Sequence, residues 1–348
     1  LDALDRIDHG RLVHLRANLD LAALVSEAWP LLFVPSRPDR AAPGWSDAEA
    51  GRGRDRAGRA DADFIRFDSD VGYDFYALSL APERVNSTAA YAPDPEDGGP
   101  AEPDAAQLRK LDRICRKLHL QPGDRLLDVG CGWGGLAIHA ARHFSATVHG
   151  VTLSPAQLAF ARARVEDLGL TDRITLELKD YRDLDGRYDA VSQIEMFEHL
   201  GFRNHDLHFR TVQRLLKPGG LYLHQASIRR GGVTPGRPGR AARAITRFIF
   251  PGGELDTLAM TVDGLARHGF ETLDVETLRP SFERTLRIWS ARLHARREEA
   301  EAMVGRARTD LWLAYFALFA RGFERGVVSV HQTLARRRTP GRHGPIFR

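Results

Sequence analysis

The sequence predicts a doubly wound α/β fold, in which a mostly parallel sheet carries helices on both faces. From about residue 105 onward, segments with apolar residues at helical spacing alternate with short apolar runs of strand length. The first of these runs, residues 125–129, leads directly into a glycine-rich loop, and a helix is expected directly after that loop. This order is typical of sheets that bind a nucleotide-like ligand at the carboxyl ends of their strands.

The expected elements follow one another along the chain. Helices are predicted over residues 106–119, 135–143, 155–168 and 205–215. Strands are predicted over residues 125–129, 147–152, 174–178, 188–194 and 220–225. From Glu283 to about Ala335 the chain is rich in helix formers, which predicts two further helices packed against the sheet or over a pocket.

The 348-residue chain is expected to hold one large domain and a smaller N-terminal segment. Apolar residues up to about residue 35 predict a helix followed by a strand. Arg, Ala, Gly and Asp dominate between Pro35 and Ala62, which is typical of a flexible linker. We therefore expect the N-terminal segment and linker at 1–62, the main domain with its C-terminal helices at 63–338, and a tail at 339–348.

Composition argues against several classes of protein. No run of 18 or more uncharged apolar residues could span a bilayer, and the N-terminus lacks the order of a signal peptide, so the expected location is the cytoplasm. Cys115 and Cys131 are too few for a disulfide framework and lack metal-ligand spacing, so no metal site is predicted.

One segment is strongly basic. Six arginines lie between Arg229 and Arg247 without an acidic residue, and the apolar residues Phe248, Ile249 and Phe250 follow. Each basic residue at an anionic membrane surface contributes roughly 1 kcal/mol of binding. The segment is therefore either a membrane contact or a solvated loop. Nucleic-acid binding is not supported, because no helix-turn-helix pattern or interleaved aromatic platform accompanies the arginines.

The glycine loop is the strongest local signal for a ligand. Gly130, Gly132 and Gly134 allow a ligand to approach the backbone N–H groups closely, and the following helix N-terminus favours an anion or carboxylate. A dinucleotide site would also carry an acidic residue at the end of the second strand. The sequence there reads Gly150-Val-Thr-Leu-Ser-Pro-Ala-Gln157, without an acid. The loop thus predicts a nucleotide-like ligand but not its identity.

Five motifs in order identify a family resemblance. Asp128 and the G-x-G-x-G spacing resemble the first motif of class I S-adenosylmethionine methyltransferases. Together with the four motifs that follow, they resemble the cyclopropane fatty acid synthase family, including its mycolic acid relatives, over roughly residues 66–337. The resemblance implies a Rossmann-like methyltransferase sheet of seven strands with helical additions. The four motifs are Thr152-Leu-Ser-x-x-Gln157, Asp180-Tyr181-Arg-Asp183, Met196-Phe-Glu-His199 and Phe250-Pro-Gly-Gly253.

This resemblance implies which residues bind the cofactor S-adenosylmethionine. Gly130 and Gly132 would line its methionine part, next to Asp128, and Asn86 and Ser87 would lie near its carboxylate. Contacts to the ribose and adenine would come from Thr152, Leu153, Ser154, Gln157, Asp180 and Tyr181. Ser154 is also expected to cap the helix that starts at Pro155, which is compatible with a ligand contact.

The resemblance also implies the chemistry. An alkene attacks the methyl group, and the resulting cation loses a proton to a bound bicarbonate, which Glu198 and His224 would hold. Two candidate catalytic positions depart from the family pattern. Thr88 replaces a Cys that contacts bicarbonate, and Phe282 replaces a Tyr. The lost hydroxyl removes a charge-assisted hydrogen bond of roughly 1.5–3 kcal/mol, so bicarbonate as a second cofactor is an open question.

The expected function is methyl transfer to the double bond of unsaturated acyl chains in membrane phospholipids, giving a cyclopropane. Open alternatives are a methylene- or methyl-branched chain formed from the same cation, C-methylation of a non-lipid alkene, and a catalytically weak partner subunit. The expected partners are the phospholipid and an anionic membrane surface at the inner face, without nucleic acid, and a homodimer is left open. Five aromatic residues either roof an acyl channel or form plain core: Trp289, Trp312, Tyr315, Phe316 and Phe323.

Overall fold

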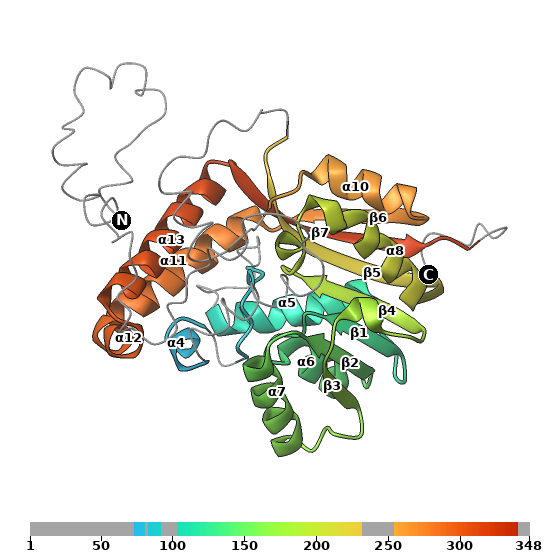
Figure 1. The fold of residues 1–348 in the computed structure, drawn as a ribbon, viewed down its shortest axis with the longest axis horizontal. Coiled ribbons are helices and arrows are strands. Elements are labelled where there is room, and N and C mark those ends of the chain that lie inside the picture. The colour runs from blue at the N-terminus through green and yellow to red at the C-terminus, as the bar shows by residue number, and fades with distance from the viewer. Residues whose placement is uncertain (1–72, 81–82, 92–102, 232–253, 340–348) are drawn as a thin grey trace, which may run out of the picture.

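The computed structural model describes residues 73–80, 83–91, 103–231 and 254–339 and contains a seven-stranded sheet (Figure 1). The strand order is β3-β2-β1-β4-β5-β7-β6. Neighbours are parallel from β3 to β5, whereas β7 is antiparallel to both β5 and β6. The predicted doubly wound, mostly parallel sheet is therefore confirmed. The strands are β1 (Arg125–Val129), β2 (Thr147–Thr152), β3 (Ile174–Leu178), β4 (Tyr188–Ile194), β5 (Leu216–Arg229), β6 (Phe270–Thr277) and β7 (Val328–Arg337).

Helices cover both faces of the sheet (Figure 1). One face carries α5 (Pro103–Lys117), α6 (Gly135–His143) and α7 (Pro155–Asp167), and the other carries α8 (His205–Leu215) and α10 (Leu258–Arg267). Because successive strand residues point to opposite faces, Leu126 and Leu127 of β1 enter two different apolar cores. The short 3-10 helices η4 (Tyr181–Asp183), η5 (Phe197–His199) and η6 (Phe202–Asn204) lie in the loops that follow β3 and β4.

A third core lies at one end of the sheet. It is formed by the short helix α4 (Tyr73–Ala77) with α11 (Arg279–Ala295), α12 (Arg297–Val304) and α13 (Arg306–Glu324), which lie together in Figure 1. Aromatic rings dominate it, as in the pair Phe282–Phe323, whose centroids are 4.7 Å apart. Trp133 joins this core from the glycine loop, with its ring 5.1 Å from that of Tyr76. The helices are thereby packed against the loop.

The predicted bounds of β1, β2, β3, β4, α6 and α8 are confirmed residue by residue, and α5, α7 and β5 occupy the predicted places with shifted ends. The prediction of two helices from Glu283 to about Ala335 is wrong. Three helices occupy this region, and the segment after Gly326 forms β7 between β5 and β6. Helix α10 and strand β6 were not predicted. Strand β7 is buried at successive residues, so the alternation that marks a half-buried strand is absent.

Several predictions fall outside the described residues. These are the helix and strand before residue 35, the linker, the Phe250-Pro-Gly-Gly253 motif and most of the Arg229–Arg247 segment. The domain boundary at residue 62 and the tail thus stay predictions. In the ranges that the structure does describe, no helix combines the length and the apolar character needed to cross a bilayer.

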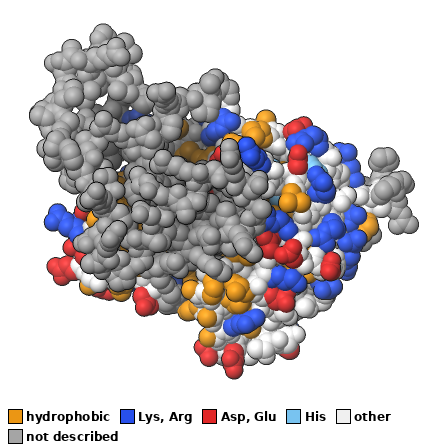
Figure 2. All heavy atoms as spheres, viewed as in Figure 1, with side chains coloured by type: hydrophobic (Ala, Val, Ile, Leu, Met, Phe, Trp, Pro, Cys, Tyr) orange, Lys and Arg blue, Asp and Glu red, His pale blue; other side chains and the backbone are white. Residues whose placement is uncertain are grey.

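Basic and acidic side chains are interspersed on the surface around α8 and α10, as Figure 2 shows. Arg267 donates hydrogen bonds to Asp206 and Asp263, at 2.9 and 2.8 Å. Exposed pairs of this kind contribute about 0.2–1 kcal/mol each to stability. This part of the described surface thus carries mixed charge and not a basic patch.

The contact between α10 and α8 yields a testable prediction. A Cβ atom at Gly264 would lie 2.5 Å from the ring of Phe209. We expect Gly264→Ala to lower the free energy of unfolding by about 1–3 kcal/mol, although Ala is otherwise about 1 kcal/mol better than Gly inside a helix. Urea denaturation measures the change. The control is Gly231→Ala, whose Cβ would meet no atom of the described residues within 4 Å. Unchanged stability of Gly264→Ala would contradict this packing.

Candidate active site

A cavity of about 310 Å³ lies where the loops after β1, β2, β3 and β4 come together. One part of its wall is the glycine loop with the segment Arg84–Ser87. Another part is apolar and comes from α11 and α13, which contribute Phe282, Trp289, Tyr315 and Phe319. The cavity thus joins the polar ends of the sheet to an aromatic wall.

Most of the predicted site residues line this cavity, and three do not. Thr88, Ser154 and His224 lie outside its lining. The predicted residues that line it are Asn86, Ser87, Asp128, Gly130, Gly132, Thr152, Leu153, Gln157, Asp180, Tyr181, Glu198 and Phe282.

The glycine loop has the conformation that a closely bound ligand requires. Gly130, Gly132 and Gly134 have φ values of 76°, 54° and 81°, in the left-handed region that side chains disfavour. The N–H groups of Gly130 and Cys131 both donate to the Val151 carbonyl, at 3.0 Å, which ties the loop to β2. Within the described part of the chain, a Cβ atom at Gly132 would meet no atom within 4 Å, so this residue opens onto the cavity.

Asp128 supplies a buried carboxyl beside the loop. Its side chain is buried and accepts a hydrogen bond from Ser192 Oγ at 2.9 Å. Burial raises the pKa of Asp128 to about 6, while the Ser192 hydrogen bond and the charge of Lys110 oppose that rise. Asp128 is therefore mostly ionised at neutral pH.

The loops after β2 and β3 present polar groups to the same cavity. Thr152 Oγ1 donates to Gln157 Oε1 at 2.9 Å, which holds these two lining side chains together. Asp180 is paired with Arg182, and the Tyr181 hydroxyl lies 2.9 Å from His208 Nδ1. Ser154 is buried and caps α7, accepting a hydrogen bond from the Gln157 N–H at 3.3 Å. The structure thus confirms Ser154 as a helix cap.

The residues present fit S-adenosylmethionine. The glycine cradle leaves room for close approach, Asp128 provides a buried negative charge for a cationic ligand, and Gln157 and Asp180 offer hydrogen-bonding groups suited to a ribose and a base. All of them reach one cavity.

Lys110 is a functional candidate that the sequence reading missed. It lies on the buried face of α5 and is fully buried, and its Nζ donates to Ser87 Oγ at 2.9 Å. Burial lowers the pKa of Lys110, and the carboxylates of Glu195 and Asp128 oppose that fall. The signal in the sequence was a lysine at helical spacing with Gln107, Leu111 and Ile114.

The segment before α5 is fastened over the cavity from several sides. Gln107 Nε2 donates to the Ser87 carbonyl at 2.9 Å, and the Ala89 N–H donates to Thr285 Oγ1 of α11 at 3.1 Å. A Cβ atom at Gly135 would lie 2.8 Å from Val85 and 2.9 Å from the Glu83 carbonyl, so this segment lies directly against the glycine loop. Asn86 and Ser87 are held there.

Glu198 is a buried carboxyl in the cavity wall. Its Oε1 accepts a hydrogen bond from the Ser227 N–H at 2.5 Å, while Oε2 is buried without a donor among the described residues. Burial, together with the neighbouring Glu195, raises the pKa of Glu198 to about 8. Glu198 is therefore mostly protonated at neutral pH.

Glu195 is the second candidate that the sequence reading missed. It directly follows β4, lines the cavity, and accepts hydrogen bonds on Oε1 from the Thr88 N–H at 3.1 Å and from Gln225 Nε2 at 2.6 Å. Burial raises its pKa, against the effect of Lys110 and of these hydrogen bonds. Its signal was an acidic residue at the carboxyl end of a predicted buried strand, next to the Met196-Phe-Glu-His199 motif.

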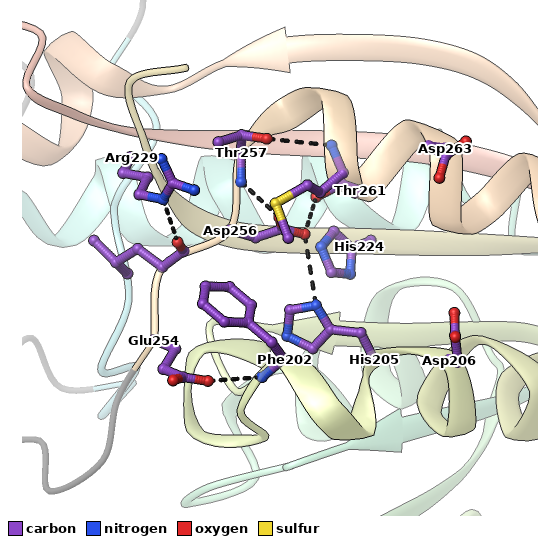
Figure 3. A network of polar contacts seen from close by, with 12 residues as sticks. Phe202, His205, Asp206, His224, Arg229, Glu254, Asp256, Thr257, Thr261 and Asp263 are labelled. Atoms are coloured by element: carbon purple, nitrogen blue, oxygen red, sulfur yellow. Dashed lines mark hydrogen bonds and ion pairs between the residues drawn. The ribbon is translucent and has the colours of Figure 1, made fainter. Parts of the chain in front are cut away.

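His224 does not reach the cavity. It is buried under the Phe197 ring, 4.7 Å between centroids, and its Nδ1 lies 3.0 Å from the Tyr222 hydroxyl. Burial lowers its pKa to about 3. Figure 3 shows the His224 ring in one view with that of His205, the neighbour that helps to lower the pKa of His224. Because His224 and Gln225 point to opposite faces of β5, the predicted pairing of Glu198 with His224 around one anion is not the arrangement in the structure.

Thr88 and Phe282, the two positions that depart from the family pattern, differ in their contacts. The Thr88 hydroxyl donates to the Ala89 carbonyl at 3.0 Å, and the side chain is fully buried, so only the backbone N–H of this residue is directed to Glu195. Phe282 lines the cavity and presents no hydrogen-bonding group there.

The five aromatic residues that were expected either to roof an acyl channel or to form core all belong to the helical core, and two of them also line the cavity. Trp289 and Tyr315 line the cavity, whereas Trp312, Phe316 and Phe323 pack in the helical core and are absent from the lining. Phe319 is a further lining residue.

Comparisons with known proteins show the family of this chain. Residues 57–333 match the sequence family described as mycolic acid cyclopropane synthetase. A probable fatty acid methyltransferase of Pseudomonas putida is 42% identical over 285 residues, which cover 80% of this chain and 70% of that protein. The cyclopropane-fatty-acyl-phospholipid synthase of Escherichia coli K12 is 35% identical over 227 residues, which cover 65% of this chain and 55% of that protein.

Solved structures of high similarity include the mycolic acid cyclopropane synthase CmaA1 in complex with SAH and CTAB. It superposes with a TM-score of 0.73 at 28% identity, over 79% of this chain and 98% of that one. The cyclopropane synthase MmaA2 of Mycobacterium tuberculosis gives a TM-score of 0.75 at 27% identity, over the same shares of the two chains. The chain therefore belongs to the mycolic acid cyclopropane synthetase family and is an S-adenosylmethionine-dependent methyltransferase.

Proposed function

We propose that this protein transfers a methyl group from S-adenosylmethionine to the double bond of an unsaturated acyl chain in a membrane phospholipid. The observation that carries the proposal is the single cavity in which the glycine cradle, an aromatic wall and the carboxyl groups of Glu195 and Glu198 meet. An isolated alkene is a weak nucleophile, so it must be held in line with the methyl group and kept from water.

The residues of the chain have separate tasks in this reaction. When bound, S-adenosylmethionine supplies an electrophilic methyl group. Phe282, Trp289 and Tyr315 hold an apolar chain and exclude water from the reacting carbon atoms. A carboxylate at the cavity wall stabilises the cation that develops on the acyl chain. A base in the wall must then remove one proton.

Two products can follow from that cation. We propose the methylene-branched chain as the main product, because three relatives are named as methyltransferases and not as cyclopropane synthases. They are the Pseudomonas putida protein and two proteins of Mycobacterium tuberculosis at 34% identity, named fatty acid methyltransferase or tuberculostearic acid methyltransferase. The cyclopropane expected from the sequence is the second candidate, favoured by the name of the Escherichia coli relative. That name also supports a phospholipid acceptor.

The acceptor would be met at an anionic membrane surface on the inner face of the membrane. The feature that supports this part of the proposal is the run of arginines from Arg229 to Arg247 with the apolar residues that follow it.

The first test is mass spectrometry of total fatty acids from bacteria that express this chain and are fed methyl-labelled methionine. We expect monounsaturated chains to gain one labelled CH2 unit, and derivatisation of the alkene to separate a methylene from a ring. Replacing both carboxyl groups of the cavity wall, Glu195→Gln together with Glu198→Gln, should reduce the labelled product at least tenfold, because neither a carboxylate nor a base remains there. Glu299→Gln, at an exposed glutamate, should not reduce it. A protein that is folded but forms no labelled lipid would point to a non-lipid alkene or to a partner subunit.

A matched pair of glycines tests the cofactor site. Gly132 and Gly169 have φ values of 54° and 63°, and a Cβ atom at either would meet no atom within 4 Å among the residues that the structure describes. Of the two, only Gly132 lines the cavity. We expect Gly132→Ala and Gly169→Ala to lose about 1–2 kcal/mol of stability each, because both residues stay left-handed. Only Gly132→Ala should weaken S-adenosylmethionine binding in calorimetry, by about tenfold or more. Equal affinities of the two variants would refute the assignment.

The protonation state of Glu198 has a measurable consequence. Its pKa of about 8 in the folded protein lies above that of an unfolded glutamate, so the folded state binds more protons and loses stability as pH rises towards 8. The loss is about 1 kcal/mol per pH unit. We expect Glu198→Gln to gain stability relative to the wild type between pH 6 and pH 8 in urea denaturation. Parallel pH dependences of the two proteins would show that Glu198 is ionised throughout.

A further inference from the structure

Glu195 has a backbone conformation that its residue type disfavours. Its φ is 52°, in the left-handed region, directly after the last residue of β4. Its N–H donates to the Gln225 carbonyl at 2.7 Å, which fixes this turn to β5. Non-glycine residues held in such conformations cost about 1–3 kcal/mol and cluster at functional sites. The turn directs the Glu195 side chain into the cavity wall.

The carboxyl group of Glu195 is held by a chain of hydrogen bonds. The Thr88 N–H and Gln225 Nε2 both donate to Oε1, at 3.1 and 2.6 Å. Gln225 is itself oriented by Gln332 of β7, whose Nε2 donates to Gln225 Oε1 at 2.8 Å. Since both donors contact the same oxygen, Oε2 is left for a group in the cavity. Fixed donors of this kind favour the ionised form of a carboxyl.

The surrounding charges make Glu195 the carboxyl that ionises first. The positive charge of Lys110 lowers the pKa of Glu195, against the effect of burial. Among the described residues no cationic side chain lowers the pKa of Glu198, and the negative charge of Glu195 raises it. Of two adjacent carboxyls, one therefore bears the charge and the other the proton. The charge lies on the residue with two donors and a nearby ammonium group.

Resting on the function proposed above, we propose that Glu195 is the base of the reaction and takes the place of a bound bicarbonate. Methyl transfer forms a C–C bond to one alkene carbon while the S–C bond breaks with its electron pair left on sulfur, so the neighbouring carbon becomes a cation. A C–H bond of the new methyl group then breaks. The proton goes to Glu195 Oε2, and the electron pair forms the methylene double bond after a hydride shift, or closes the ring.

The same contacts leave few hydrogen-bond donors for a separately bound anion. Thr88 stands where the family resemblance implies a contact to bicarbonate, and its N–H is already used by Glu195. Phe282 presents no hydroxyl, and His224 is buried away from the cavity. A side-chain carboxylate therefore occupies the donor that the anion would need. The reaction is expected to be independent of bicarbonate.

The test uses the purified full chain, vesicles of unsaturated phosphatidylglycerol and labelled S-adenosylmethionine in buffer freed of carbon dioxide. We expect the wild type to keep at least 80% of its rate when bicarbonate is removed. Glu195→Gln should lower the rate at least 100-fold while its affinity for S-adenosylmethionine changes less than threefold. Glu195→Gly, which also relieves the backbone strain, should be equally slow and should regain at least tenfold in rate with sodium formate.

Each outcome bears on one proposal. A wild type that requires bicarbonate, or a Glu195→Gly variant that is fully active without any added anion, would overturn the assignment of Glu195. Formate rescue of Glu195→Gly but not of Glu195→Gln would support it, because only glycine leaves space for the anion. A wild type that binds S-adenosylmethionine but labels no lipid under any condition would instead contradict the proposed function.

Discussion

The buried ammonium group of Lys110 is the interaction on which the rest of the site depends. Removing a charge from water costs several kcal/mol unless opposite charges compensate it, and Asp128 and Glu195 supply that compensation. The positive charge of Lys110 in turn lowers the pKa of both carboxyl groups, against the rise that burial causes. These charged groups come from α5, from β1 and from the residue after β4, so one buried site combines three separate elements.

The reacting end of the cavity combines two requirements that oppose each other. A cation on an acyl chain must be kept from water by apolar walls. The proton that this cation loses must go to a carboxylate, and an apolar environment disfavours the ionised form of a carboxyl group. Glu195 meets both because fixed hydrogen-bond donors replace its water shell, and one of these donors, Gln225, is oriented from β7. Strand β7, which is antiparallel to β5, thus helps to orient the proposed base although it does not contact the glycine loop.

The fold was predictable where each element carries its own signal. Residues 125–129 and 188–194 are short segments of strand length in which apolar residues predominate, and their predicted bounds agree with the structure. Strand β7 gave no such signal, because it lies between β5 and β6 and is buried at successive residues, including Gln332 and Thr333. Its partners in β5 lie from 99 to 115 residues away along the chain, and that pairing overrides local propensity.

Local sequence patterns were enough to predict that Gly130, Gln157 and Asp180 lie together, because loops that follow parallel strands meet at one edge of the sheet. They were not enough to predict which charged groups lie at that edge. A lysine in α5 becomes a partner of Glu195 through packing between distant segments, and His224 is turned to the opposite face of β5. A local sequence pattern predicts which face of a helix or strand a side chain occupies, but its contacts depend on segments that are distant in the sequence.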